Sequence, residues 1–231
     1  MADDESKVFL ITGASTGIGA ATARLAVAAG YRVVLAARSA DRLDALATDL
    51  GGDERAIAVA TDVTDWPQQQ ALAARALEHF GGLDIVFANA GFGAQRSFAG
   101  DSPEHWRDMV LTNVLGVAYT IRATLETIRE RQGHMILTSS AAGRRAIVGS
   151  LYSATKHAVT AMGESLRQEL NGTGARVTLI EPGMVDTPFF DERPKEALVD
   201  DDIARGVLYA LSQPPHVDVN ELLIRPTAQA G

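Results

Sequence analysis

The chain contains no cysteine, and this absence excludes disulfide bonds, thiol nucleophiles and metal sites built from cysteine. It also lacks any apolar run that approaches the length needed to cross a bilayer. Basic residues are in the minority, because 21 Lys and Arg stand against 29 Asp and Glu, for a net charge of −8. That balance argues against nucleic acid and against an anionic membrane as partners.

The first residues, 1–6, are acidic and polar, unlike a secretory signal. We expect them to form a flexible tail on a cytoplasmic protein. Hydrophobic residues make up 46% of the chain and are dispersed along it. A chain of 231 residues therefore suffices for one α/β domain with a large core, and we predict a single domain over residues 1–231.

Short apolar runs alternate with segments rich in helix formers, a pattern that indicates a parallel sheet with helical connections. The sequence predicts a doubly wound, Rossmann-type α/β fold, with a mostly parallel seven-stranded sheet and helices on both faces. The expected strands cover residues 8–12, 32–36, 56–60, 84–88, 134–138, 176–180 and 221–224. The expected helices cover residues 17–29, 41–50, 65–80, 103–131, 150–171 and 202–212.

A glycine-rich loop follows the first expected strand and opens the first expected helix. Its glycines are Gly13, Gly17 and Gly19. Strand, glycine loop and helix together point backbone N–H groups and a helix N-terminus at a phosphate. The spacing is Gly-x-x-x-Gly-x-Gly and differs from the common Gly-x-Gly-x-x-Gly fingerprint. An ordinary glycine-rich turn is the alternative for this loop taken alone.

Tyr152 and Lys156 stand four residues apart in an expected helix, so their side chains emerge on one face. The pKa of a phenol is ordinarily about 10. An ammonium group one turn away favours the phenolate and would lower that pKa toward neutral, as acid–base catalysis needs. Taken alone, the pair could equally be a surface lysine beside a half-buried tyrosine.

Further motifs occur in one order along nearly the whole chain, and with them the sequence resembles the short-chain dehydrogenase/reductase family, in its NADP-preferring branch. They are Thr12-Gly-Ala-Ser-Thr-Gly-Ile-Gly19, Asp62-Val63, Asn89-Ala-Gly91, Asn113, Ser139-Ser140, Tyr152-x-x-x-Lys156 and Pro182-Gly183-x-x-x-Thr187. Residues 220–226 also resemble, less specifically, a C-terminal branch of bacterial hydroxy-acid and small-alcohol reductases.

The resemblance implies a catalytic group of four residues. Tyr152 would be the general acid or base, and Lys156 would hold the nicotinamide ribose and lower the pKa of that tyrosine. Asn113 would anchor a water from a helix whose regularity it interrupts, and Ser140 would bind the substrate oxygen. Ser139 is the alternative, because its spacing of thirteen residues to Tyr152 is common among relatives, whereas the Ser-x-x-Gly pattern favours Ser140.

The resemblance also implies a cofactor, NADP(H). At the end of the second strand, Ala37 stands where an acidic residue would hold both ribose hydroxyls, and Arg38 and Ser39 could bind a 2′-phosphate instead. Thr16 is a counter-signal, because some NADP-preferring relatives carry a basic residue there. The implied cofactor-binding residues are Gly13, Ser15, Thr16, Gly17, Ile18, Gly19, Arg38, Ser39, Asp62, Val63, Asn89, Ala90, Gly91, Tyr152, Lys156, Pro182, Gly183, Val185 and Thr187.

We therefore expect an NADP(H)-dependent oxidoreductase that interconverts a small carbonyl compound and an alcohol. The alternative is a regulator that senses NADP(H) without turnover; an epimerase or dehydratase would need a larger C-terminal domain. Residues 183–200 and 141–151 should line the substrate pocket, where Arg144 and Arg145 are either solvated or attract an acidic substrate. No metal is expected, since the histidines lack metal-binding spacing. Family members commonly form dimers or tetramers, here through helices 103–131 and 150–171.

Overall fold

The computed structural model describes residues 6–94, 97–187 and 195–229. Seven parallel strands form one sheet in the order β3-β2-β1-β4-β5-β6-β9, as predicted from the sequence. The strands are β1 Val8–Thr12, β2 Arg32–Ala37, β3 Ala56–Ala60, β4 Ile85–Ala88, β5 His134–Thr138, β6 Arg176–Pro182 and β9 Glu221–Ile224. The strand order reverses between β1 and β4, which creates the crevice where doubly wound folds bind ligands.

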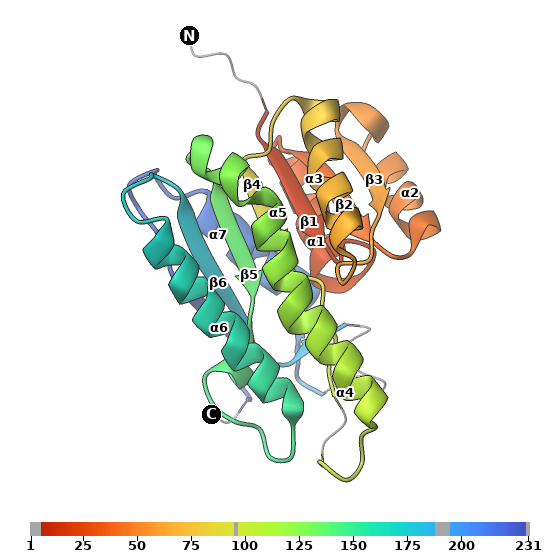
Figure 1. Cartoon of the computed structure of the whole chain (residues 1–231), viewed down its shortest axis with the longest axis vertical. Coiled ribbons are helices and arrows are strands. Elements are labelled where there is room, and N and C mark those ends of the chain that lie inside the picture. The colour runs from red at the N-terminus through yellow and green to blue at the C-terminus, as the bar shows by residue number, and fades with distance from the viewer. Residues whose placement is uncertain (1–5, 95–96, 188–194, 230–231) are drawn as a thin grey trace.

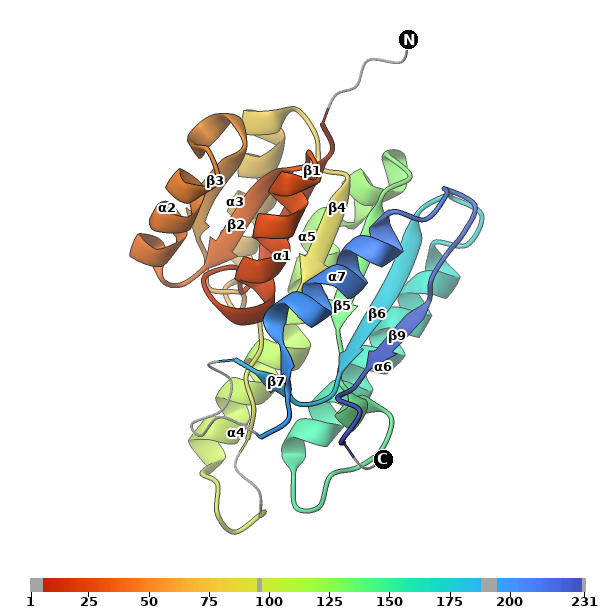
Figure 2. The same cartoon turned by 180° about the vertical axis from the view of Figure 1, so that it is seen from behind.

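Helices cover both faces of the sheet. They are α1 Gly17–Ala28, α2 Ala40–Asp49, α3 Trp66–Phe80, α4 Pro103–Val110, α5 Val117–Glu130, α6 Leu151–Glu169 and α7 Asp200–Leu211. Figure 1 shows α3, α5 and α6 in front of the sheet, and Figure 2, the view from behind, shows α1 and α7 on the other face. Among the described helices, none combines the length and the apolar composition of a membrane span.

The two faces of each central strand supply two separate cores, because successive side chains point in opposite directions. In β1, Phe9 and Ile11 pack with α1, α2 and α7, whereas Val8 and Leu10 pack with α3, α5 and α6. All five residues of β1 are buried, as expected for a parallel strand covered on both sides. The sheet is therefore a rigid platform for the loops that follow its strands.

Local signals in the sequence explain where two of the helices begin. Before α3, the Asp65 carboxylate accepts a hydrogen bond from Gln68 N at 2.9 Å, with Pro67 in the first turn. Before α4, the Ser102 hydroxyl accepts one from His105 N at 3.1 Å. Both caps satisfy N–H groups that a helix start leaves without partners.

The structure departs from the sequence prediction in two segments. The long helix expected over residues 103–131 is divided by a π-helical turn, η2 Leu111–Gly116, between α4 and α5. The segment 183–200 contains a small parallel ladder between β7 Val185–Asp186 and β8 Leu198–Val199. Residues 188–194 and 1–5 of the predicted loop and tail lie outside the described residues.

Candidate active site

The carboxyl ends of three central strands are joined by one side chain, that of Asn89. Its amide nitrogen donates to Thr12 O at 3.1 Å, and its amide oxygen accepts from the Thr138 hydroxyl at 3.1 Å. The Thr12 hydroxyl in turn accepts from the backbone N–H groups of Asn89 and Ala90 at 3.0 and 3.1 Å. These bonds fix the ends of β1, β4 and β5 relative to one another, where the predicted site residues gather.

The glycine loop between β1 and α1 is shaped for close backbone approach. Gly13 has φ +67°, a conformation that favours glycine. A Cβ on Gly19 would overlap the Gly13 carbonyl oxygen and lie 2.9 Å from Asn89 Nδ2. At the start of α1, Thr16 makes no side-chain capping bond, and the first turn contains no acidic residue. Its N–H groups are therefore available to a phosphate, so this cradle fits the pyrophosphate of a dinucleotide.

Arg38 and Asp62 lie close enough to influence one another after the ends of β2 and β3. The Asp62 carboxylate accepts hydrogen bonds from the backbone and hydroxyl of Thr64 at 2.9 and 2.8 Å. Burial acts to raise the pKa of Asp62, but the Thr64 bonds and the charge of Arg38 outweigh it, so the pKa is lowered. Ala37 is the last residue of β2 and Ser39 precedes α2. The predicted ribose-end residues are thus neighbours at one end of the sheet.

Asn113 is fully buried within the π-helical turn. Its side-chain oxygen accepts from Phe92 N at 3.0 Å, and its nitrogen donates to Phe92 O at 2.8 Å and to the Thr155 hydroxyl at 3.3 Å. A Cβ on Gly91 would lie 3.0 Å from that oxygen and 3.7 Å from Lys156 Nζ. Asn113 therefore lies beside the Gly91 backbone and near Lys156, and π turns often occur at functional sites.

Gln69 of α3 supports this turn, although it was not among the residues predicted from the sequence. Its buried amide nitrogen donates to Val63 O at 3.1 Å, to Gly116 O at 3.2 Å and to the Thr120 hydroxyl at 2.9 Å. It thereby joins the loop after β3 to the π-helical turn. Its only signal in the sequence is a glutamine in the apolar stripe of a helix, where burial of a polar group requires partners.

Tyr152 and Lys156 share one face of α6, as the sequence predicted. Lys156 Nζ lies 5.6 Å from the Tyr152 ring centroid and donates to Thr138 O at 2.8 Å. Burial lowers the pKa of Lys156 to about 8. Burial raises the pKa of Tyr152 to about 12, and a hydrogen bond with the Ser140 side chain offsets this only in part.

The expectation that Lys156 lowers the pKa of Tyr152 is therefore wrong for this structure. The physical reason is desolvation, which disfavours the phenolate and the ammonium alike. The lysine is directed to the carbonyl oxygen of Thr138 at the end of β5.

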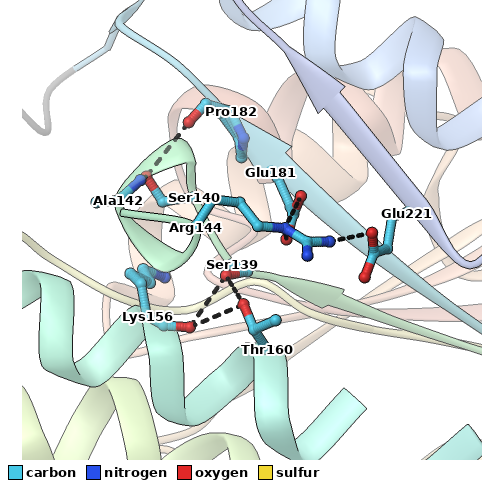
Figure 3. Close-up of polar contacts among 9 residues, drawn as sticks. All are labelled: Ser139, Ser140, Ala142, Arg144, Lys156, Thr160, Glu181, Pro182 and Glu221. Atoms are coloured by element: carbon cyan, nitrogen blue, oxygen red, sulfur yellow. Dashed lines mark hydrogen bonds and ion pairs between the residues drawn. The ribbon is translucent and has the colours of Figure 1, made fainter. Parts of the chain in front are cut away.

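The two candidate serines have different surroundings. The Ser139 hydroxyl contacts the Lys156 carbonyl oxygen at 3.1 Å and the Thr160 hydroxyl at 2.7 Å, both on α6 (Figure 3). The Ser140 hydroxyl accepts from Ala142 N at 3.1 Å, and its side chain is close enough to Tyr152 to lower the pKa of the phenol. Of the two, Ser140 therefore adjoins the phenol.

The chain after β6 is held by the C-terminal residues. Gly183 N donates to Ile224 O at 2.7 Å, and Met184 N donates to the side-chain oxygen of Gln229 at 2.9 Å. Pro182 ends β6, Val185 is buried in β7, and Thr187 follows that short strand. The predicted nicotinamide-end residues thus follow β6, as expected.

Arg144 is exposed, and it also forms ion pairs that neither sequence alternative included. Its Nε lies 2.8 Å from both carboxylate oxygens of Glu181, and its guanidinium also contacts Glu221. The side chain of Glu181 is 1% exposed. Arg144 is thus exposed to solvent, as one of the two alternatives supposed, but its guanidinium is already paired with two carboxylates from neighbouring strands, which compete with an acidic substrate for it. No short-range pattern in the sequence predicts this pairing across 37 residues.

The chain is similar to known proteins along most of its length. A family model described as short chain dehydrogenase matches residues 7–197. An uncharacterized oxidoreductase of Staphylococcus haemolyticus is 41% identical over 231 residues, covering 98% of this chain and 100% of that protein. An alcohol dehydrogenase from the archaeon Thermococcus sibiricus, solved with 5-hydroxy-NADP, is 34% identical with a TM-score of 0.91, covering 98% and 99% of the two chains. A short chain dehydrogenase/reductase from Burkholderia phymatum, solved with NAD, is 28% identical with a TM-score of 0.84, covering 96% and 90%. The chain belongs to the short-chain dehydrogenase family.

Proposed function

We propose that this protein is an NADP(H)-dependent oxidoreductase that interconverts a carbonyl compound and an alcohol. The observation that carries the proposal is the arrangement of Ser140, Tyr152 and Lys156 around the end of β5, beside a glycine loop that fits a pyrophosphate. Asn113 adjoins the same group through the Gly91 backbone. A phenol, a hydroxyl and a buried ammonium together can bind a substrate oxygen and transfer a proton to it.

Each of these residues has a proposed role in the reaction. Tyr152 is protonated at neutral pH, as a phenol is at its ordinary pKa of about 10 and still more at the raised value of about 12, so its proton is available to a carbonyl oxygen on which negative charge develops during reduction. Ser140 holds the same oxygen and stabilises the charge that develops there. Lys156 orients the cofactor ribose, and Asn113 holds a water that returns the proton to the phenol. When bound, the nicotinamide supplies or accepts the hydride.

The preference for NADP(H) rests on the end of β2. Ala37 offers no carboxylate to the ribose hydroxyls, and the adjacent Arg38 and Ser39 can bind a 2′-phosphate through charge-assisted hydrogen bonds. One similar protein was solved with 5-hydroxy-NADP and another with NAD, so family membership leaves the choice to these residues. We propose that the other residues named above as cofactor contacts bind the same dinucleotide.

The substrate pocket is proposed to include residues 141–151 and the loop that follows β6. The first segment leads into Tyr152, and its Val148 is 91% exposed, which favours a substrate with an apolar part.

We also propose a homodimer or homotetramer in the cytoplasm, assembled through α4, α5 and α6. Light scattering on the purified protein tests the assembly.

The decisive test of the function compares cofactors and then substrates. Fluorescence titration should give NADPH binding at least about tenfold tighter than NADH, equivalent to 1.4 kcal/mol. Arg38→Asp should reduce or reverse this ratio, whereas Arg42→Asp, an exposed change in the neighbouring helix, should leave it unchanged. Equal affinity of the unmodified protein for both cofactors would contradict the cofactor assignment.

An NADPH-oxidation screen over a carbonyl panel should then give turnover. Binding of NADPH without any turnover would favour the alternative function, a regulator that senses NADP(H).

A further inference from the structure

Among the described residues, the Ser140 end of the turn makes one direct hydrogen bond to the neighbouring strand β6. Ser140 precedes the 3-10 turn η3 Ala141–Gly143, whose backbone is closed by Gly143 N donating to Ser140 O at 2.8 Å. The Ser140 hydroxyl reaches Pro182 O on β6 at 3.3 Å. That length exceeds the usual range of about 2.5–3.0 Å for an O–H···O hydrogen bond, so the bond is weak. This contact alone is therefore a poor anchor for a hydroxyl that must stay against the phenol of Tyr152.

Arg144 provides the stronger anchor at the other end of the same turn. It is the residue directly after η3, and its Nε lies 2.8 Å from each oxygen of Glu181, which precedes Pro182 in β6. Figure 3 shows Ser140 and Arg144 reaching two successive residues of β6 from the two ends of the turn. The turn is thus attached to the strand at both ends.

A second carboxylate completes the contact. Glu221 of β9 contacts the Arg144 guanidinium and is the register partner of Leu179 in β6. Because side chains alternate along a strand, Glu181 and Glu221 lie on the same face of the sheet. Only a planar guanidinium offers several fixed donors that reach both carboxylates at once, which a lysine ammonium cannot do in the same way.

The charges make this arrangement persistent. Burial raises the pKa of Glu181, and its hydrogen bond and ion pair with Arg144 oppose that rise. The hydrogen bonds to both carboxylates raise the pKa of Arg144, so it stays protonated. Removing one partner of a buried pair leaves an uncompensated charge, which is strongly unfavourable. The arginine therefore cannot leave Glu181 without a cost, and η3 stays where it is.

We propose that Arg144 is a positioning residue, whose contacts with Glu181 and Glu221 hold η3 so that the Ser140 hydroxyl stays against Tyr152. The inference rests on the role assigned above to Ser140 in the proposed function. It requires that Arg144 act on the reaction through Ser140 and not by contact with substrate or cofactor.

The test compares Arg144→Met with Arg129→Met. Arg129 is a matched control, because it also bonds two carboxylates, Glu126 and Glu169, and is similarly exposed, at 34% against 37%. Its contacts lie on the outer surface of α5 and α6. Arg144→Met should lower kcat/KM by roughly 10–100-fold, the scale of a misplacement near 1 Å, mainly through kcat. The Kd for the cofactor should change less than about twofold, and Arg129→Met should leave kcat/KM unchanged.

A double-mutant cycle tests whether the effect passes through Ser140. If it does, Arg144→Met should cost little further activity in a Ser140→Ala background, because the hydroxyl to be positioned is already absent. A full, additive loss in that background would overturn the proposal. So would a loss of thermal stability with kcat/KM unchanged, since that result describes a merely structural ion pair.

An arm without substrate separates this inference from the proposed function. Amide exchange measured by NMR should become about tenfold faster at Ala142 and Gly143 in Arg144→Met, because the turn opens more often, and stay unchanged in Arg129→Met. Unchanged exchange in both variants would overturn the proposal even if the enzyme is active. Faster exchange in a protein that turns over no carbonyl would support the anchoring of η3 and contradict only the proposed function.

A second variant covers the case in which Arg144→Met does not fold. Arg144→Met combined with Glu181→Met removes the buried carboxylate that would otherwise be left without a partner. We expect this pair to fold and still to show the fast exchange at Ala142 and the lowered kcat. Recovery of both quantities to the level of the unmodified protein would overturn the proposal.

Discussion

Each end of the sheet buries a titratable base, Lys156 at the carboxyl end and His134 at the amino end. Comparing them shows that burial alone does not identify a functional residue. At the carboxyl end, Lys156 is 4% exposed, donates to Thr138 O, and has its pKa lowered by burial to about 8. At the amino end, His134 is 1% exposed, and its pKa is lowered to about 3 by burial and by the charges of Arg176 and Lys7. Only the lysine can change its protonation state near neutral pH.

The surroundings of the two bases differ more than their burial does. The Lys156 ammonium lies beside the phenol ring of Tyr152 and near the Gly91 backbone. The His134 ring forms a hydrogen bond with a hydroxyl, and its Nε2 lies 2.7 Å from Thr178 Oγ1. That hydroxyl donates to Val219 O at 2.7 Å, so Nε2 carries the imidazole proton and donates to it. A buried base therefore marks a catalytic site only where groups that can exchange a proton with a substrate converge on it.

The largest expected effect on turnover comes from changing Tyr152, the proposed acid at the carboxyl end of the sheet. Tyr152→Phe removes the hydroxyl and keeps the ring, so the fold and cofactor affinity should persist. Turnover should fall by about 10²–10⁴-fold, the usual contribution of general acid–base catalysis. Steady-state kinetics with NADPH and one good carbonyl substrate measure the loss, with Tyr209→Phe, exposed on α7, as control. Near-normal turnover of the Tyr152 variant would show that another group donates the proton.

The next largest effect distinguishes the two serines at the carboxyl end of the sheet, Ser139 and Ser140. Ser140→Ala should lower kcat/KM by roughly 10²-fold, the scale for one donor to a developing oxyanion. Ser139→Ala removes a hydroxyl that contacts only α6 atoms, Lys156 O and Thr160 Oγ1, among the bonds described. It should cost about 1 kcal/mol of stability with little change in kcat/KM. The reverse ranking of the two variants would transfer the substrate contact to Ser139.

The sequence predicted this end of the molecule well because its signals are local. The strand, glycine loop and helix of residues 8–29 are contiguous, and Tyr152 and Lys156 are one helical turn apart. The order of motifs after successive strands then predicts one edge of a parallel sheet, where all seven strands of the fold do end. Such inferences need only periodicity, spacing and the topology of the fold class.

The sequence did not predict ion pairs between distant residues or the burial of titratable groups. The partners of Arg144 lie on two other strands, and the π-helical turn at Asn113 exists in a segment whose pattern is continuous with helix. The pKa of Tyr152 was predicted in the wrong direction because spacing reveals a neighbouring charge, whereas burial is set by the packed structure. The same holds for the pKa of His134, because its place in an expected strand shows neither how completely the ring is buried nor which charges surround it.

The smallest expected effect concerns the amino end and should leave catalysis untouched. The pKa of His134 is about 3 in the folded chain and ordinarily about 6.5, so the unfolded chain binds more protons between these values. The free energy of unfolding should therefore decrease as the pH falls from 6.5 toward 3, by up to about 1.4 kcal/mol per pH unit from this group. His134→Gln removes the titration and keeps a donor for Thr178, so its stability should depend less steeply on pH.

Urea unfolding at pH 7, 6, 5 and 4 measures the difference, with His216→Gln, an exposed change, as control. Parallel pH profiles for His134→Gln and the unmodified protein would contradict the assignment, and so would a loss of turnover beyond about twofold at pH 7, because a purely structural base should not affect the chemistry at the opposite end of the sheet.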